Sequence, residues 1–165
     1  MKVITAVESY RPNDKEVCVF LAGGITKCAD WQKAVIAELE KYELPNLVVF
    51  NPRRENFPID NPNASQEQIE WEFHWLERMD IFSMYFSAGE SVQPICMYEL
   101  GRNLVMMAYR GILNRCVISV EKGYKREQDV IIQTKLAVGK DIVFTDATPQ
   151  KHALGIVGIY NKMSR

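Results

Sequence analysis

The carboxylate of Glu99 lies near the start of a helix-like segment that follows an apolar run at residues 81–86. Pro94 suits the first helical position, because the peptide nitrogen there needs no partner within the helix. Glu99 then lies about one turn inside the helix, with its side chain leaning back toward the helix start. In α/β proteins the chemistry is concentrated where a strand ends and a helix begins, so Glu99 is the first candidate for a functional group.

Helical periodicity alone leaves the environment of Glu99 open. It places Glu99, Asn103 and Arg110 opposite the apolar stripe, which is also the pattern of a solvated glutamate. The immediate neighbours of Glu99 in the sequence are mostly apolar, however. Its carboxylate would then face a pocket or a subunit contact and would need polar partners to offset desolvation. The predicted stripe consists of Met97, Leu100, Gly101, Leu104, Met107 and Ala108.

Two further motifs carry candidate chemistry. Glu72 lies beside Trp71, and Trp71 shares a helix face with Trp75, although aromatic residues at this spacing are more often core than ligand-stacking. Gly23-Gly24 ends an apolar run and would let the backbone approach a sugar or phosphate, while a plain turn explains it equally well. The glycine spacing matches neither a dinucleotide fingerprint nor a P-loop, which disfavours NAD and ATP.

A long loop at residues 51–64 contains Arg53-Arg54. These guanidinium groups can hold a phosphate or another anion, can remain solvated, or can bridge subunits. The pattern alone does not choose among the three.

The composition indicates one domain, residues 1–165, with 47% hydrophobic residues. The 20 Lys and Arg residues nearly balance the 21 Asp and Glu residues. Binding to a nucleic-acid polymer is therefore not expected, and a small-molecule substrate or ligand is the simplest expectation. Four widely spaced cysteines predict reduced thiols and a cytoplasmic location. Two histidines make zinc unexpected, and no apolar stretch predicts a signal peptide or a membrane span.

Apolar runs alternate with helix-like segments along the chain, which predicts five βα units. The runs are apolar on both faces, as in a parallel sheet covered by helices. We therefore predict an α/β fold with a doubly wound, five-stranded parallel sheet, a flavodoxin/Rossmann-like three-layer sandwich. Residues 2–7 are either an edge strand or a tail. Asp30 is a predicted helix cap, and Ser65 with Gln68 forms a predicted capping box. The predicted strand–helix pairs are 17–22 and 30–42, 46–50 and 65–78, 81–86 and 94–109, 115–120 and 125–137, and 142–145 and 149–162.

The order and spacing of these motifs resemble the nucleoside 2-deoxyribosyltransferase family over roughly residues 16–120. Residues 123–134 resemble one branch of that family, which extends the similarity toward the whole chain. The motifs that carry the resemblance are Gly23-Gly24, Asn51-Pro52-Arg53-Arg54, Trp71-Glu72, Asp80-Ile81, Gln93-Pro94 and Glu99-Leu100-Gly101.

The resemblance implies that Glu99 is a nucleophile that forms a glycosyl ester, which a second base resolves with net retention. It implies that Glu72 moves the proton of the base. Gly23, Gly24 and Gln93 would lie near the sugar, Asn51 near the substrate entrance, and Trp71 beside the base. It also implies nucleoside and nucleobase substrates, no metal or organic cofactor, no membrane partner, and a homo-oligomer with shared active sites.

Several positions depart from the family pattern. Phe20 stands where a tyrosine beside the nucleophile is common, and Gln93 stands where a sugar-binding aspartate is common. Asp141 and Tyr160 match only weakly the residues that a neighbouring subunit contributes. These departures bear on substrate preference more than on reaction type. Two other functions stay open: an N-glycoside hydrolase acting on a nucleoside or a deoxynucleoside 5′-monophosphate, whose phosphate would suit Arg53-Arg54, and a non-catalytic nucleotide-binding sensor.

Overall fold

Six parallel strands form one sheet in the computed structural model, which describes residues 1–163. The predicted α/β class is confirmed, whereas the predicted strand number of five is wrong. Residues 164 and 165, which the predicted domain includes, lie outside the described residues. The strands are β1 (Lys2–Thr5), β2 (Val17–Gly23), β3 (Leu47–Asn51), β4 (Ile81–Phe86), β5 (Cys116–Glu121) and β6 (Val143–Ala147).

The additional strand is β1, which pairs with β3 at the edge of the sheet. It has four residues, of which only Ile4 is buried, so its apolar pattern is too short to distinguish a strand from a tail. Lys2 Nζ contacts Glu16 Oε1 at 2.6 Å and Tyr10 Oη at 2.8 Å. These contacts tie the edge strand to the segment that precedes β2.

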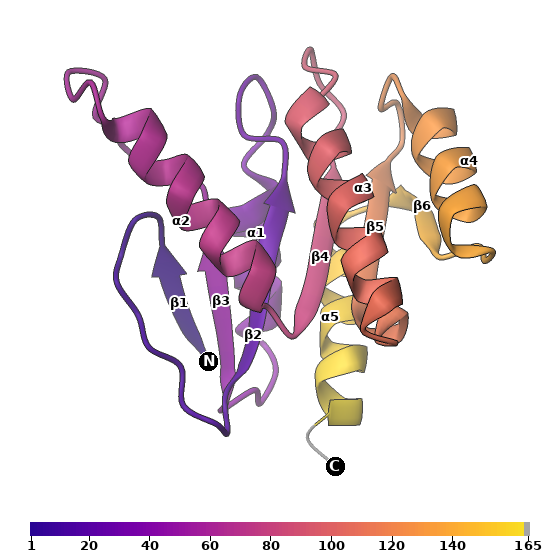
Figure 1. The fold of residues 1–165 in the computed structure, drawn as a ribbon, viewed down its shortest axis with the longest axis horizontal. Coiled ribbons are helices and arrows are strands. Elements are labelled where there is room, and N and C mark those ends of the chain that lie inside the picture. Colours follow the sequence, from indigo (N-terminus) through magenta and orange to yellow (C-terminus); the bar gives the residue numbers. More distant parts are fainter. Residues whose placement is uncertain (164–165) are drawn as a thin grey trace.

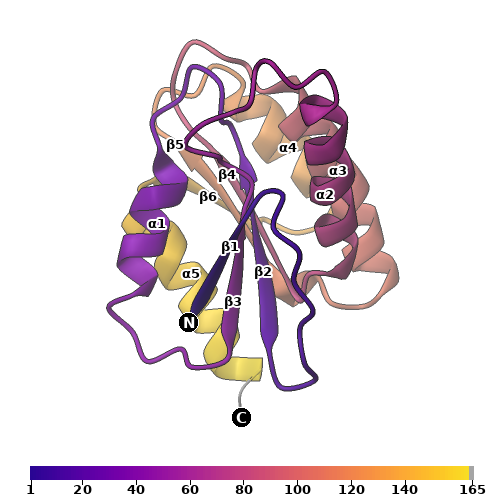
Figure 2. The ribbon, with the colours of Figure 1, turned by 90° about the vertical axis from the view of Figure 1, so that its left-hand side faces the viewer.

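Helices cover both faces of the sheet, as the apolar strands predicted (Figure 1). Helices α1 and α5 lie on one face, and α2, α3 and α4 lie on the other, which Figure 2 shows edge-on. Asp30 caps α1 as predicted, since its Oδ1 accepts a hydrogen bond from Lys33 N at 3.0 Å. The helices are α1 (Trp31–Leu39), α2 (Ala64–Arg78), α3 (Pro94–Tyr109), α4 (Glu127–Val138) and α5 (Pro149–Met163), with a short 3₁₀ turn at Leu113–Arg115.

The strand order is β1-β3-β2-β4-β5-β6, so the winding of the chain reverses between β2 and β4. After β2 the chain passes into α1 on one face, and after β4 it passes into α3 on the other face. The two connections therefore diverge at the carboxyl ends of neighbouring strands. Such a reversal leaves a crevice where α/β proteins bind ligands.

The α1/α5 face holds a buried polar group that no sequence pattern indicated. His152 on α5 is 1% exposed and lies between Ser83 of β4 and Ser119 of β5, with both N–O distances 2.7 Å. Burial lowers the pKa of His152 to about 3, so the ring is neutral and its two nitrogens pair with two hydroxyl groups. This arrangement joins α5 to two central strands.

No helix within residues 1–163 is long and apolar enough to cross a membrane. The four cysteines are free thiols: Cys18 and Cys96 are buried, and Cys28 and Cys116 are half-buried.

Candidate active site

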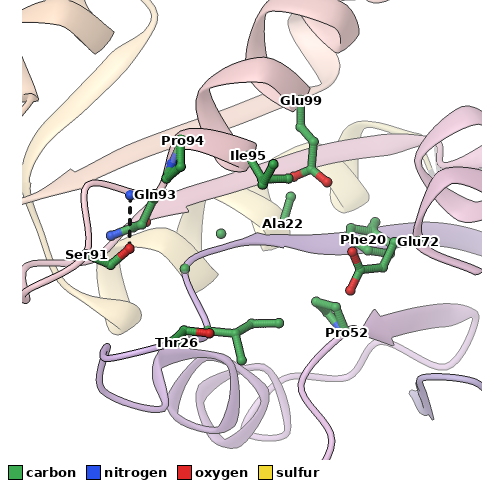
Figure 3. A pocket seen from close by; sticks show the side chains of 13 residues that line it. Phe20, Ala22, Thr26, Pro52, Glu72, Ser91, Gln93, Pro94, Ile95 and Glu99 are labelled. Carbon is green, nitrogen blue, oxygen red and sulfur yellow. Dashed lines mark hydrogen bonds between the residues drawn. The ribbon is translucent and has the colours of Figure 1, made fainter. Parts of the chain in front are cut away.

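A cavity of about 310 Å³ opens at the point where the winding reverses. Figure 3 shows the carboxylates of Glu72 and Glu99 near one end of it and the side chains of Gln93 and Ser91 near the other. Helices α2 and α3 supply the two carboxylates, while the connections after β2 and β4 supply the remaining polar wall. The lining residues are Phe20, Ala22, Gly23, Gly24, Ile25, Thr26, Pro52, Glu72, Ser91, Gln93, Pro94, Ile95 and Glu99.

Glu99 is half-buried on the flank of α3 that faces α2. Burial, together with the negative charge of Glu72, raises the pKa of Glu99 to about 7, although the Arg102 guanidinium acts in the opposite direction. Repulsion between two carboxylates is mutual, so near neutral pH the pair favours a state that holds one proton. A pair with one proton can supply an ionised nucleophile and a protonated acid at the same time.

The predicted apolar stripe of α3 is wrong at several positions. Gly101 and Ala108 are exposed, while Asn103 is fully buried and donates a hydrogen bond to the Glu99 carbonyl at 2.8 Å. Packing against both the sheet and α4 turns the buried face toward Asn103, and this brings Glu99 to the edge of the core. The buried residues of α3 are Cys96, Leu100, Asn103, Leu104 and Met107.

Glu72 is also half-buried, and burial raises its pKa. Gln68, one turn earlier on α2, donates from Nε2 to Glu72 Oε1 at 2.8 Å and to the Pro52 carbonyl at 2.9 Å. The predicted capping box of Ser65 and Gln68 is therefore wrong, because α2 begins at Ala64 and Gln68 binds these two groups instead. Gln68 fixes the orientation of the Glu72 carboxylate.

The opposite wall of the cavity requires glycine. A Cβ atom on Gly23 would lie 2.3 Å from the Tyr85 carbonyl oxygen, and one on Gly24 would lie 2.6 Å from the Gln93 side chain. Gln93 is 4% exposed and donates from Nε2 to the Ser87 carbonyl at 2.7 Å. Its Oε1 is buried and has no hydrogen-bond partner among residues 1–163, which leaves an acceptor unpaired at this wall.

The sequence pattern of a family described as nucleoside 2-deoxyribosyltransferase like matches residues 16–124. The chain belongs to this family. The matched region contains every residue that lines the cavity. A search of curated proteins finds none that matches the chain.

Five of the seven site residues inferred from resemblance to the nucleoside 2-deoxyribosyltransferase family line the cavity: Gly23, Gly24, Glu72, Gln93 and Glu99. The other two do not. Asn51 lines a neighbouring hollow, where its Oδ1 accepts from Arg53 N at 3.0 Å. Trp71 packs against the core aromatics Phe20 and Phe50, with ring centroids 6.0 and 6.1 Å away, and its Nε1 donates to the Glu8 carbonyl. Its ring is partly buried against this core cluster and is not among the residues that line the cavity.

The departures from the family pattern have structural counterparts. Phe20 lines the cavity and offers no hydroxyl to Glu99. Tyr160 is 4% exposed and its hydroxyl accepts from Asn46 N at 3.3 Å, while Asp141 pairs with Lys135 at 2.9 Å on the surface.

Sequence reasoning assigned Gln68 to a helix cap and missed its hydrogen bond to Glu72, although its spacing of one helical turn before Glu72 was a usable signal. It also missed the cavity residues Ile25, Thr26 and Ile95, which belong to a connection or to the helix start and carry no motif, whereas Ser91 was an alternative to Gln93 as a sugar contact. Within residues 1–163, no three His, Cys, Asp or Glu side chains gather as a metal site requires.

Proposed function

We propose that this protein transfers a 2-deoxyribosyl group between nucleobases through a covalent ester on Glu99. The observation that carries the proposal is one cavity bordered by two half-buried carboxylates and, across from them, by a close-packed glycine wall with a free buried acceptor. A sugar fits between these walls with its anomeric carbon toward the carboxylates. The family to which the chain belongs supports the same assignment.

In the first half-reaction the ionised Glu99 attacks the anomeric carbon while the bond from that carbon to the base nitrogen breaks. The protonated Glu72 gives its proton to the departing nitrogen, so the base leaves neutral. In the second half-reaction an incoming base attacks the same carbon and displaces Glu99, and Glu72 takes the proton that the base loses. Two inversions give net retention.

Mutual repulsion lets the pair hold its one proton on either carboxylate, and the reaction uses the state in which the proton is on Glu72. While Glu99 is ionised, its charge favours the protonated form of Glu72, which is the form that an acid needs. Once Glu99 is a neutral ester, that repulsion disappears, and the hydrogen bond from Gln68 stabilises the Glu72 carboxylate as a base. The same residue is thus suited to both half-reactions.

The cavity favours an uncharged nucleoside over a nucleotide. A phosphate is normally held by cationic groups, and neither arginine nor lysine lines the cavity among the described residues. Arg53, which the sequence offered as an anion site, instead donates to backbone carbonyls outside the cavity. The free Oε1 of Gln93 accepts hydrogen bonds and would repel a phosphate oxygen. These contacts favour a nucleoside over a deoxynucleoside 5′-monophosphate as the substrate, and so argue against the 5′-monophosphate hydrolase.

The decisive experiment incubates the protein with deoxyinosine, with and without adenine, and separates the products by chromatography. We expect deoxyadenosine only when adenine is present. Free hypoxanthine and deoxyribose at the same rate without adenine would replace transfer with hydrolysis, and binding without turnover would favour the sensor. Glu99→Gln should abolish the reaction, whereas Glu77→Gln, an exposed change on α2, should leave it intact.

A further inference from the structure

We propose that Arg53 is a positioning residue that holds the cavity wall in place for sugar binding. The wall in question is the glycine loop, defined here as residues 24–29, which connects β2 to α1. This inference deepens the proposed function and rests on it for its kinetic consequence. The geometric part, that Arg53 orders the glycine loop, stands independently of the reaction.

The guanidinium of Arg53 contacts the glycine loop, the buried Gln32 and the α1 cap Asp30, whose Oδ1 lies 3.5 Å from Arg53 Nε. Its Nη2 donates to the Ile25 carbonyl at 2.9 Å and the Ala29 carbonyl at 3.1 Å, with a longer contact of 3.4 Å to the Gly24 carbonyl. Its Nε donates to Oε1 of the buried Gln32 at 3.0 Å. The side chain is 16% exposed, so the bonds to Gln32 and the Ile25 carbonyl are partly shielded from competing water, whereas the bond to the Ala29 carbonyl is exposed.

The glycine loop has few other contacts with the rest of the described fold. Cys28 forms an isolated β-bridge with Gly89, and the indole Nε1 of Trp31 donates to the Gly24 carbonyl at 2.9 Å. The Gln32 Nε2 atom lies 3.5 Å from the same carbonyl, and Lys27 Nζ lies 3.4 Å from Glu90 Oε2 on the surface. Arg53 contacts carbonyls near both ends of the loop, which no other side chain of the described residues does among the hydrogen bonds found. A planar guanidinium can serve several carbonyls at once, whereas a lysine ammonium is a single point charge.

Arg53 contacts the glycine loop from the side that faces away from the cavity. Gly24, Ile25 and Thr26 face the cavity, while Arg53 lines the separate hollow that also contains Arg54. Gly24 packs closely against the Gln93 side chain within this wall, because a Cβ on Gly24 would lie 2.6 Å from it. A small displacement of the loop would therefore change the width of the sugar site without any change at the carboxylates.

The backbone beside Arg53 links this wall to the acid/base residue. Asn51 Oδ1 accepts from Arg53 N at 3.0 Å, which fixes the turn after β3. The next carbonyl, that of Pro52, accepts from Gln68, and Gln68 holds Glu72. Residues 51–53 thus contact both parts of the site: Arg53 binds the glycine loop, and the Pro52 carbonyl binds the helix that carries Glu72.

The test compares Arg53→Gln and Arg53→Lys with the matched control Arg54→Gln. Hydrogen exchange followed by mass spectrometry reads the order of residues 24–29, and steady-state transfer kinetics with deoxyinosine and adenine read its consequence. In both Arg53 variants we expect faster exchange confined to the glycine loop. We expect KM for deoxyinosine to rise about 10- to 100-fold, the range produced by losing a hydrogen bond to a charged group. The loop binds the sugar in ground and transition states alike, so kcat should change much less than KM.

Arg54→Gln should match the wild type in both measurements, because the Arg54 guanidinium lies over the Phe57 ring rather than against the glycine loop. Unchanged exchange at residues 24–29 in the Arg53 variants would overturn the proposal. Wild-type KM in Arg53→Lys would also overturn it, since charge alone would then suffice. If Arg53→Gln fails to fold, Arg53→Lys, which keeps the charge and much of the stem, decides the question. A wild-type protein that turns over no deoxynucleoside would refute the proposed function, while the exchange result would still decide whether Arg53 orders the loop.

Discussion

Replacement of Glu99 by glutamine should make the protein more stable above pH 7. The carboxylate of Glu99 is half-buried beside Glu72, and its pKa rises to about 7 from 4.5 in an unfolded chain. The folded state then binds the proton more tightly than the unfolded state, so stability is greatest below pH 4.5 and falls as pH rises toward 7. Glutamine keeps the shape of the side chain and carries no charge, which removes this loss.

The magnitude follows from the pKa difference at 1.36 kcal/mol per pH unit. The ionised Glu99 costs the fold about 3 kcal/mol at pH 8 and about 1 kcal/mol at pH 5. Glu99→Gln should therefore gain about 2 kcal/mol more at pH 8 than at pH 5 relative to wild type. A gain of this size is a substantial part of the 5–15 kcal/mol typical of a whole domain.

Urea denaturation at the two pH values measures the effect, with Glu77→Gln as a control that removes an exposed carboxylate from α2. The control should show a change below about 0.5 kcal/mol at either pH. The reasoning would be refuted if Glu99→Gln were no more stable than wild type at pH 8. It would equally fail if the gain were the same at pH 5 and pH 8, because burial of a charge must depend on ionisation.

Three further outcomes follow from other contacts. Gln68→Leu removes the donor that lowers the pKa of Glu72, so the alkaline limb of the transfer rate against pH should move upward, and Gln66→Leu on the same helix should leave it in place. Gly23→Ala puts a methyl 2.3 Å from a backbone oxygen of β4, and urea titration should show a loss of about 2–3 kcal/mol. His152→Ala leaves two buried hydroxyl groups unpaired and opens a cavity, and the same titration should show a loss of about 3 kcal/mol with transfer specificity unchanged.

Local sequence patterns were sufficient for most of the architecture. Strands β2 to β6 and all five helices follow from apolar runs, helix-like segments and turn residues, and Asp30 caps its helix as predicted. These features depend on neighbours within a few positions along the chain. The edge strand β1 was left open because four residues that are mostly exposed carry too little pattern, and its pairing with β3 depends on a partner more than forty residues away.

In the candidate site, too, some features follow from local sequence patterns and others depend on the tertiary structure. Motif order pointed to Glu72 and Glu99, and both border one cavity. Motif order also placed Trp71 beside the base, whereas its ring packs against the core aromatics Phe20 and Phe50. The sequence left the role of Arg53 open among an anion, solvent and a subunit contact, and the fold directs it to backbone carbonyls. Residue type alone says what a side chain is able to bind, and which partner it binds depends on what the fold brings within reach.

The sequence by itself indicated the α/β class, the family and two candidate carboxylates, because periodicity and motif spacing are properties of the chain. Only the tertiary structure decided which walls meet at the reversal between β2 and β4, how burial raises the pKa of Glu99, and that Gln93 keeps a free acceptor. Desolvation, mutual repulsion and hydrogen-bond satisfaction depend on distances between residues remote in sequence, and packing of the whole chain sets those distances.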